Sequence, residues 1–246
     1  MDVLSAFYEK SIPMLEWSDL YLLSPLLILY IVSAAVLAGW LRSREHVITP
    51  YTRKVFHFLI FTMAAALQVV FGLKTVLVFG VWTCMAVLYA LVRGEGHPFY
   101  EALARPKDAP RRSLFILIPL ASTAVGGLVS NLFFPDAAFI GYLAAGWADA
   151  IAEPVGTRWG KHTYAVPSLY GVRATRSLEG SLAVLVTGLL AVLICGVILD
   201  VESKKMLELA LACGLTAALV EAFSHHGLDN LTVQVAVSAA ASMILG

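Results

Sequence analysis

Long apolar runs, separated by shorter polar segments, recur along the whole chain. The runs lie at residues 20–41, 54–71, 73–92, 113–134, 137–155, 181–199, 206–223 and 230–246. A helix rises about 1.5 Å per residue, so about 17–25 apolar residues cross a hydrocarbon core about 30 Å thick. The pattern predicts eight transmembrane helices, with seven as the alternative, because the last two runs are shorter and more polar.

Composition indicates the same fold class. Of the 246 residues, 59% are apolar and 14% are charged, and the mean hydropathy is +0.81, whereas soluble domains are roughly 45–50% apolar and about 25% charged. Seventeen Lys and Arg balance seventeen Asp and Glu, so no basic field favours nucleic acid. Cys84, Cys195 and Cys213 lie inside apolar runs, where we expect them to pack. We expect an all-α, polytopic integral membrane protein with one domain over residues 1–246; the sequence leaves its oligomeric state open.

The basic residues predict the sidedness of the spans, because cytoplasmic loops carry an excess of Lys and Arg. With the N-terminus outside, the loops before the second, fourth, sixth and eighth spans face the cytosol. Thirteen of the seventeen basic residues then lie in cytosolic loops: Arg42, Arg44, Arg53, Lys54, Arg93, Arg105, Lys107, Arg111, Arg112, Arg158, Lys161, Arg173 and Arg176. The opposite side keeps Lys10, Lys74, Lys204 and Lys205. The asymmetry supports eight spans with both termini outside. The first run exceeds the roughly 7–15 residues of a signal-peptide core, so we expect it to remain as a span.

Two long polar stretches, 93–112 and 156–180, face the cytosol on this topology. The first has proline and mixed charge without recognisable chemistry, and we interpret it as a connector or an interfacial segment. The second follows a stripe of one helical face, formed by Asp149, Glu153, Gly156 and Gly160 at i, i+4, i+7 and i+11. The function is therefore expected around the second stretch.

Asp149 is predicted to lie inside the bilayer, roughly 10 Å from the cytosolic boundary, where a carboxylate is costly and needs a partner. Glu221 lies at comparable depth in the seventh span. One interpretation is an interhelical salt bridge. The other is a Mg²⁺ site, because Mg²⁺ takes one or two carboxylates and completes its shell with water and substrate phosphates.

Basic residues follow the acidic stripe at once. Arg158, Lys161, Arg173 and Arg176 would neutralise a polyphosphate, while Gly156 and Gly160 would let the backbone approach it closely. The alternative is that these residues only anchor the spans at the cytosolic face.

The start of the sixth span offers a second phosphate site. Ser177 is predicted to be its N-cap, and Glu179 lies in its first turn, where the helix dipole favours an acid. The free N–H groups from Ser177 to Ser181, with Gly180 between them, would accept a phosphate.

Two further polar clusters begin spans. Arg53, Lys54 and His57 open the second span, as a basic flank or as part of a phosphate cage. Asp229 and Asn230 open the eighth, as N-caps or as oxygen ligands. The adjacent His225 and His226 stay unassigned, because a zinc pair would use i, i+4 spacing. The chain has no P-loop and no protein-kinase motif.

Four segments together resemble the CTP-dependent lipid kinase family, which includes phytol kinase, dolichol kinase and CTP-dependent diacylglycerol kinase. They are RKVFH from Arg53, DAIAEPVGTRWGKH from Asp149, ATRSLEGS from Ala174 and LDNLTV from Leu228. The resemblance is strongest to the phytol kinase branch. Ala148 and Arg176 depart from it, since members commonly carry Gly and Lys there. The resemblance implies that Asp149 and the Glu179 region form the nucleotide-metal site and that Asp229 and Asn230 form a second patch.

We therefore expect a CTP-dependent kinase, active at the cytosolic face, that phosphorylates the hydroxyl of an isoprenoid alcohol drawn from the bilayer lipids: phytol, geranylgeraniol or a polyprenol. Phosphoryl transfer needs mainly positioning and charge neutralisation. Asp149 with Glu221 or Asp229 would hold Mg²⁺. Glu179 and Asp229 are the candidate bases. The expected nucleotide- and phosphate-binding residues are Arg53, Lys54, His57, Gly156, Arg158, Gly160, Lys161, Arg173, Arg176, Ser177, Gly180, Ser181 and Asn230.

Three alternatives stay open. A CTP-dependent diacylglycerol kinase would differ in its acceptor, and a phosphatidate cytidylyltransferase would release pyrophosphate. A transporter would also bury carboxylates, but its site usually lies near the midplane between inverted repeats, and the chain shows no repeat.

Overall fold

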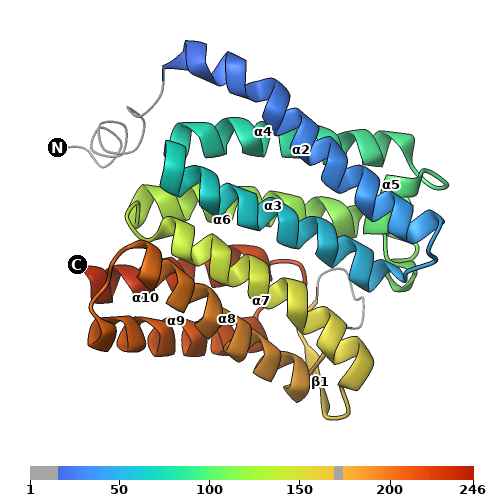
Figure 1. Cartoon of the computed structure of the whole chain (residues 1–246). Coiled ribbons are helices and arrows are strands. Elements are labelled where there is room, and N and C mark those ends of the chain that lie inside the picture. The colour runs from blue at the N-terminus through green and yellow to red at the C-terminus, as the bar shows by residue number, and fades with distance from the viewer. Residues whose placement is uncertain (1–15, 169–173) are drawn as a thin grey trace. The chain divides into compact units, whose positions relative to one another are not determined.

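The computed structural model describes residues 16–168 and 174–246. Its helices are α2 (Trp17–Ser43), α3 (Thr49–Phe71), α4 (Leu73–Arg93), α5 (Pro98–Leu103), the short 3₁₀-helix η1 (Pro106–Asp108), α6 (Leu114–Phe133), α7 (Ala138–Trp159), α8 (Leu178–Ile198), α9 (Ser203–Phe223) and α10 (Asp229–Leu245). The strands are β1 (Thr163–Val166) and β2 (Ala174–Ser177). A helix therefore occupies each of the eight predicted ranges (Figure 1).

Six helices of the described residues are long and apolar enough to cross a membrane: α2, α3, α4, α6, α8 and α9. α7 carries Asp149 and Glu153, which lower its hydropathy, and α10 has 17 residues. The expected all-α, polytopic membrane fold is confirmed. Eight crossings remain a prediction for α7 and α10.

The surfaces of α8 and α9 explain why lipid must surround them. Leucines of α9 recur every four residues at exposed positions, namely Leu207, Leu211, Leu215 and Leu219. On α8, Leu182, Val186 and Leu190 do the same. Residues four apart share one helical face, so each helix presents a continuous apolar stripe outward.

The chain divides into two compact units, residues 1–120 and 121–246. In unit 1, α5 and η1 lie in the stretch that we interpreted as a connector or an interfacial segment. Phe99, Tyr100 and Leu103 of α5 are buried, and Phe99 packs edge-on against Phe56 of α3 with ring centroids 5.0 Å apart. Apolar burial therefore makes this segment part of the core of unit 1.

Unit 2 is built by close contact of small residues. It contains most of α6 and the whole of α7, α8, α9 and α10. The α8–α9 interface is narrow, because a Cβ at Gly188 would lie 3.5 Å from the Cα of Gly214. Such small-residue contacts let membrane helices approach closely. Cys195 and Cys213 are buried between these helices without a disulfide, and Cys84 of unit 1 is half-buried, as expected.

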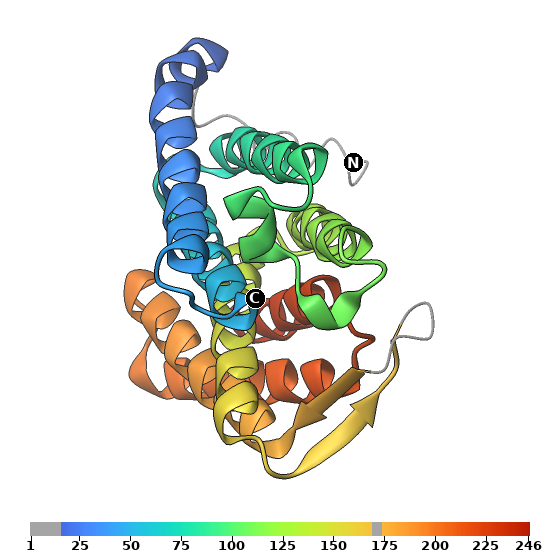
Figure 2. The same cartoon turned by 90° about the vertical axis from the view of Figure 1, so that its right-hand side faces the viewer.

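A hairpin, which the sequence did not predict, closes one end of unit 2. β1 pairs antiparallel with β2, with Thr163 opposite Ser177 and Val166 opposite Ala174. Figure 2 shows the hairpin leading from the end of α7 to the start of α8. It places the motifs on either side of it next to each other.

Candidate functional site

The predicted N-cap of α8 is confirmed, and it also joins α8 to α7. The Ser177 side chain accepts a hydrogen bond from the Gly180 N–H at 3.1 Å and is 4% exposed. A Cβ at Gly156 would lie 3.1 Å from Ser177 Oγ, and one at Gly160 only 2.8 Å from it. The last turns of α7 thus pack directly on Ser177. The glycines expected to admit a phosphate have a packing role of their own.

Arg176 lies at the centre of an ion-pair cluster. Its Nε lies 2.7 Å from Glu221 Oε1, and its Nη2 lies 3.0 Å from Asp229 Oδ2. Its Nη1 also donates to the backbone carbonyls of Glu221 and Ser224. All three charged side chains are less than one-fifth exposed. Arg176 therefore ties β2 to the end of α9 and the start of α10.

This cluster separates two roles that the sequence had combined. Glu221 and Asp229 were expected as metal ligands and Arg176 as a phosphate clamp, but the three contact one another. Among residues 16–168 and 174–246, no group of three His, Cys, Asp or Glu side chains is arranged to hold a metal ion. Glu221 forms an ion pair, as the first of the two interpretations expected, although its partner Arg176 lies in β2 and not in a helix. Mg²⁺ binding by Asp149 stays a prediction.

The corner between α9 and α10 is bound to the hairpin through the backbone. His226 N–H donates to the Pro167 carbonyl at 2.8 Å, and Ser168 forms a parallel bridge with His226. His226, unassigned from the sequence, thus has a structural contact. These bonds hold the segment after β1 beside the Arg176 cluster.

Asp229 and Asn230 are not the N-cap of α10, which was one of the two interpretations from the sequence. Leu228 is the N-cap, without a side-chain cap, and Asp229 Oδ1 accepts from the Asn230 N–H at 3.1 Å. Asn230 is 5% exposed, and its amide donates to Thr123 Oγ1 of α6 at 2.8 Å. Both residues therefore position elements, and phosphate binding by Asn230 stays a prediction.

Glu179 pairs with a residue that sequence reasoning missed. Its Oε1 lies 2.8 Å from Nδ1 of His162, whose side chain is 71% exposed. The His162 residue directly precedes β1, so the hairpin brings it back to α8. Ser181 makes a similar cross-link, with its hydroxyl 2.7 Å from the Tyr164 hydroxyl. Only the hairpin pairing, which the sequence does not signal, places these partners together.

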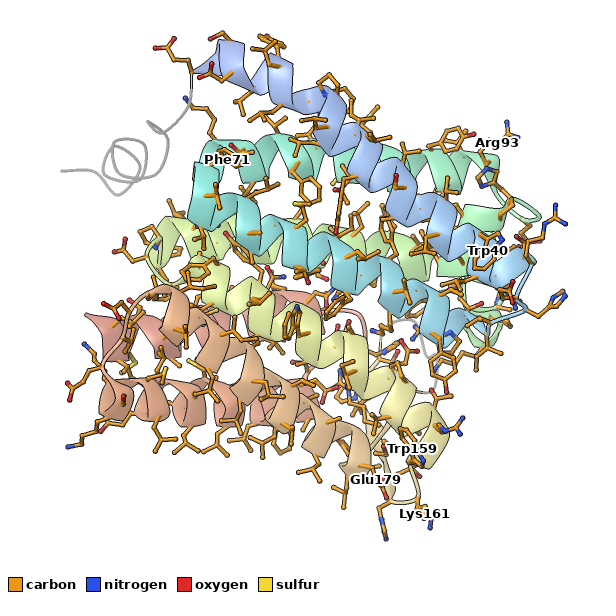
Figure 3. All side chains as sticks on the ribbon, in the orientation of Figure 1. Trp40, Phe71, Arg93, Trp159, Lys161 and Glu179 are labelled. Atoms are coloured by element: carbon orange, nitrogen blue, oxygen red, sulfur yellow. The ribbon has the colours of Figure 1, made fainter. Side chains whose placement is uncertain are left out.

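Exposed cations lie at the same end of unit 2. Figure 3 labels Trp159, Lys161 and Glu179 where α7 ends and α8 begins. Lys161 and Arg158 are exposed, and the Arg158 guanidinium lies 5.4 Å from the centre of the Trp159 ring. Arg173, the remaining predicted clamp residue, lies outside the described residues.

The acidic stripe exists as predicted, because α7 is helical from Ala138 to Trp159. Asp149 and Glu153 are half-buried and share a face with Gly156 and Gly160. That face leads toward Ser177, with Asp149 about 10 Å along the axis from Gly156. The stripe therefore runs from the interior of unit 2 to the hairpin end.

The cluster at the start of the second span, formed by Arg53, Lys54 and His57, belongs to unit 1. Lys54 is 6% exposed, Arg53 donates to the Phe115 carbonyl at 3.4 Å, and His57 stacks on Phe61 with ring centroids 4.3 Å apart. A contribution of these residues to a phosphate cage stays a prediction.

With this geometry in place, comparison with known proteins shows one informative likeness. The chain is 37% identical over 109 residues to a phytol kinase from Synechocystis sp.. The match spans 44% of this chain and 44% of that relative, so it covers less than half the length of either. No family model and no solved structure matches the chain. Over the matched part, the chain is similar to a prenol-type kinase.

Proposed function

We propose that the protein is a CTP-dependent kinase that transfers the γ-phosphoryl group to the hydroxyl of an isoprenoid alcohol at the cytosolic face of a membrane. The likeness to a phytol kinase carries the proposal. The motifs quoted above, which resemble the CTP-dependent lipid kinase family, supply the choice of CTP. The apolar surfaces of α8 and α9 support a substrate that arrives through the bilayer.

Asp149 and Glu153 are the residues we assign to Mg²⁺. They lie one turn apart on one face of α7, and Mg²⁺ usually takes one or two protein carboxylates, with water and substrate phosphates completing the shell. The pair fits an ion that arrives with its nucleotide better than one caged by protein alone. Bound Mg²⁺ would neutralise charge on the phosphates.

The exposed cations are the phosphate-binding residues we favour. Arg158 and Lys161 are exposed at the hairpin end and can reorient toward a nucleotide without breaking an ion pair to any residue that the structure describes. Arg176 is held by two carboxylates, so we assign it to positioning the hairpin.

The His162–Glu179 pair is our candidate for the proton acceptor. The Glu179 carboxylate accepts a hydrogen bond from a protonated Nδ1 of His162, which fixes the ring and leaves Nε2 without a proton, as a general base requires. Asp229, the other candidate, already accepts from Arg176 and from the Asn230 N–H.

Product analysis tests the proposal. Purified protein in nanodiscs is incubated with each nucleoside triphosphate and with phytol, geranylgeraniol, farnesol, dolichol or diacylglycerol. We expect CDP and a phosphorylated isoprenoid alcohol from CTP. Release of pyrophosphate would indicate a cytidylyltransferase, phosphatidate as product would indicate a diacylglycerol kinase, and no turnover with any pair would refute the kinase.

A further inference from the structure

A groove in unit 1 has the volume and the lining of a site for an apolar ligand. It lies between α2, α4 and α5 and encloses about 640 Å³, within the roughly 300–1,000 Å³ of small-molecule sites. Its walls are mainly aliphatic and aromatic, including Trp40 on α2 and Trp82 and Met85 on α4. These three are more than one-third exposed, so the groove opens along the sides of two predicted spans.

The end of the groove is formed by α5. Gly39 of α2 permits the contact, because a Cβ there would lie 3.2 Å from the Pro98 Cβ and 3.3 Å from the Phe99 nitrogen. Ala35 and Ala86 line the groove, and their short side chains take up little of its volume. Small residues on facing helices thus leave room that larger side chains would fill.

One buried polar atom lies at this end. Nδ1 of His97, which lines the groove, is buried and has no hydrogen-bond partner among the described residues. The ring is held edge-on against Tyr89, with centroids 5.5 Å apart. A buried polar atom without a partner is costly, so a ligand that supplies a hydrogen bond here would be favoured.

The polar end lies where spans end, as an amphiphile requires. Ser43 and Arg44, at the end of α2, also line the groove. Figure 3 places Trp40 and Arg93 at one end of unit 1 and Phe71 at the other. The chain of a ligand would therefore lie along α2 and α4 at bilayer depth, with its polar group at the level of α5.

We infer that this groove binds a single isoprenoid alcohol before the transfer step, with its hydrocarbon chain between α2 and α4 and its hydroxyl donating to Nδ1 of His97. A neutral hydroxyl can donate to this nitrogen, whereas a phospholipid diester has no proton to give. A two-chain lipid also needs more room than a groove of about 640 Å³ offers. The choice of an isoprenoid rather than another long-chain alcohol rests on the proposed function.

Quenching of tryptophan fluorescence tests the inference without any turnover. The protein in nanodiscs is titrated with a brominated C18 alcohol, which quenches tryptophans that it touches, such as Trp40 and Trp82. We expect saturable quenching that geranylgeraniol or phytol reverses. In Ala86→Phe, which fills the groove, the affinity should fall at least tenfold. Val92→Phe is the matched control, because Val92 lies on the same helix and is 86% exposed.

A second variant tests the hydroxyl contact. His97→Phe should weaken binding of the alcohol about 3–10-fold, the range for one hydrogen bond, and should leave binding of the corresponding methyl ether unchanged. Non-saturable quenching, equal effects of Ala86→Phe and Val92→Phe, or equal wild-type affinities for alcohol and ether would each overturn the inference. Asp149→Asn should still bind the alcohol, so failure of the kinase proposal and failure of the groove are distinguishable.

Discussion

At the scale of single residues, Arg176 shows how one cation organises the hairpin end of unit 2. Two carboxylates from different helices and two backbone carbonyls surround its guanidinium. Removal of one partner of a buried ion pair costs far more stability than replacement of the whole pair by apolar groups, because the remaining charge stays buried without its counter-charge. The stability of this end therefore depends on Arg176 more than its phosphate-binding interpretation implied.

Arg176→Ala should destabilise the protein by about 3 kcal/mol, because it leaves Glu221 and Asp229 buried without their counter-charge. Thermal unfolding in detergent measures the effect. Arg158→Ala is the control, since Arg158 is exposed and its loss should cost well under about 1 kcal/mol. The triple variant Arg176→Met, Glu221→Gln, Asp229→Asn should regain most of the loss. A variant Arg176→Ala with unchanged stability and weakened CTP binding would instead support the clamp.

Asp149→Asn should abolish turnover while leaving the protein folded, because the amide keeps the size of the side chain but cannot supply an anionic ligand to Mg²⁺. Glu153→Gln should reduce turnover less, since Pro154 beside it alters the local backbone bonding of α7. Initial rates across a Mg²⁺ titration, with size-exclusion profiles, separate loss of function from loss of fold. Near-normal turnover of Asp149→Asn would remove Asp149 from the metal site.

His162→Gln should lower kcat by about 100-fold without changing the KM for CTP, because it removes a proton acceptor but no phosphate contact. Glu179→Gln should lower kcat less, since the imidazole remains but loses its 2.8 Å carboxylate partner. The pH profile of kcat provides the second readout. If both variants kept the wild-type kcat and pH profile, the pair would have only a structural role.

The partners of these residues could not be read from the sequence. Ser177 was identified as an N-cap because capping is local, and Gly180 lies three residues away. Arg176 finds Glu221 and Asp229 45 and 53 residues further along the chain. The sequence supplies their charges but does not determine which charges meet, since that depends on the packing of β2 against α9 and α10.

At the scale of elements, spans were predictable and the hairpin was not. The hydrophobic runs placed the α4 and α9 segments within three residues of their observed bounds, because lipid requires a continuous apolar stretch. β1 and β2 have four residues each, too few for a period-two pattern to stand out in a polar stretch. Their pairing has a structural consequence: it joins the end of α7 to the start of α8 and supports the contact of Gly160 with Ser177.

Gly160→Ala should destabilise the junction of α7 and α8 by about 1–3 kcal/mol, the usual cost of overpacking. The new Cβ would lie 2.8 Å from Ser177 Oγ and would also meet the Gly156 carbonyl. Gly80→Ala is the control, because nothing lies within 4 Å of a Cβ there, and it should stabilise α4 by about 0.5–1 kcal/mol. Thermal melts of the two variants measure both effects. If Gly160→Ala left the stability unchanged, Gly160 would have no packing role, and phosphate binding would be the remaining explanation for a glycine there.

At the scale of the whole molecule, the open question is which side of the membrane holds the hairpin. Within unit 2, α8 runs from the hairpin to the loop before α9. Its 21 residues extend about 30 Å, which matches one crossing. The hairpin and Lys204 therefore lie at opposite ends of one span. The excess of Arg and Lys predicts that the hairpin is cytosolic, as the proposed use of cytosolic CTP requires.

Cysteine labelling should show this sidedness directly. With Cys84, Cys195 and Cys213 replaced by serine, Ala165→Cys places an exposed thiol in β1. Lys204→Cys places one in the first turn of α9, just beyond the other end of α8. An impermeant maleimide should label Lys204→Cys in intact cells and Ala165→Cys only after the membrane is opened, because α8 separates the two by one bilayer thickness. The reverse pattern would invert the topology and remove the hairpin's access to cytosolic CTP. Labelling of both sites in intact cells would show that α8 does not cross the membrane at all.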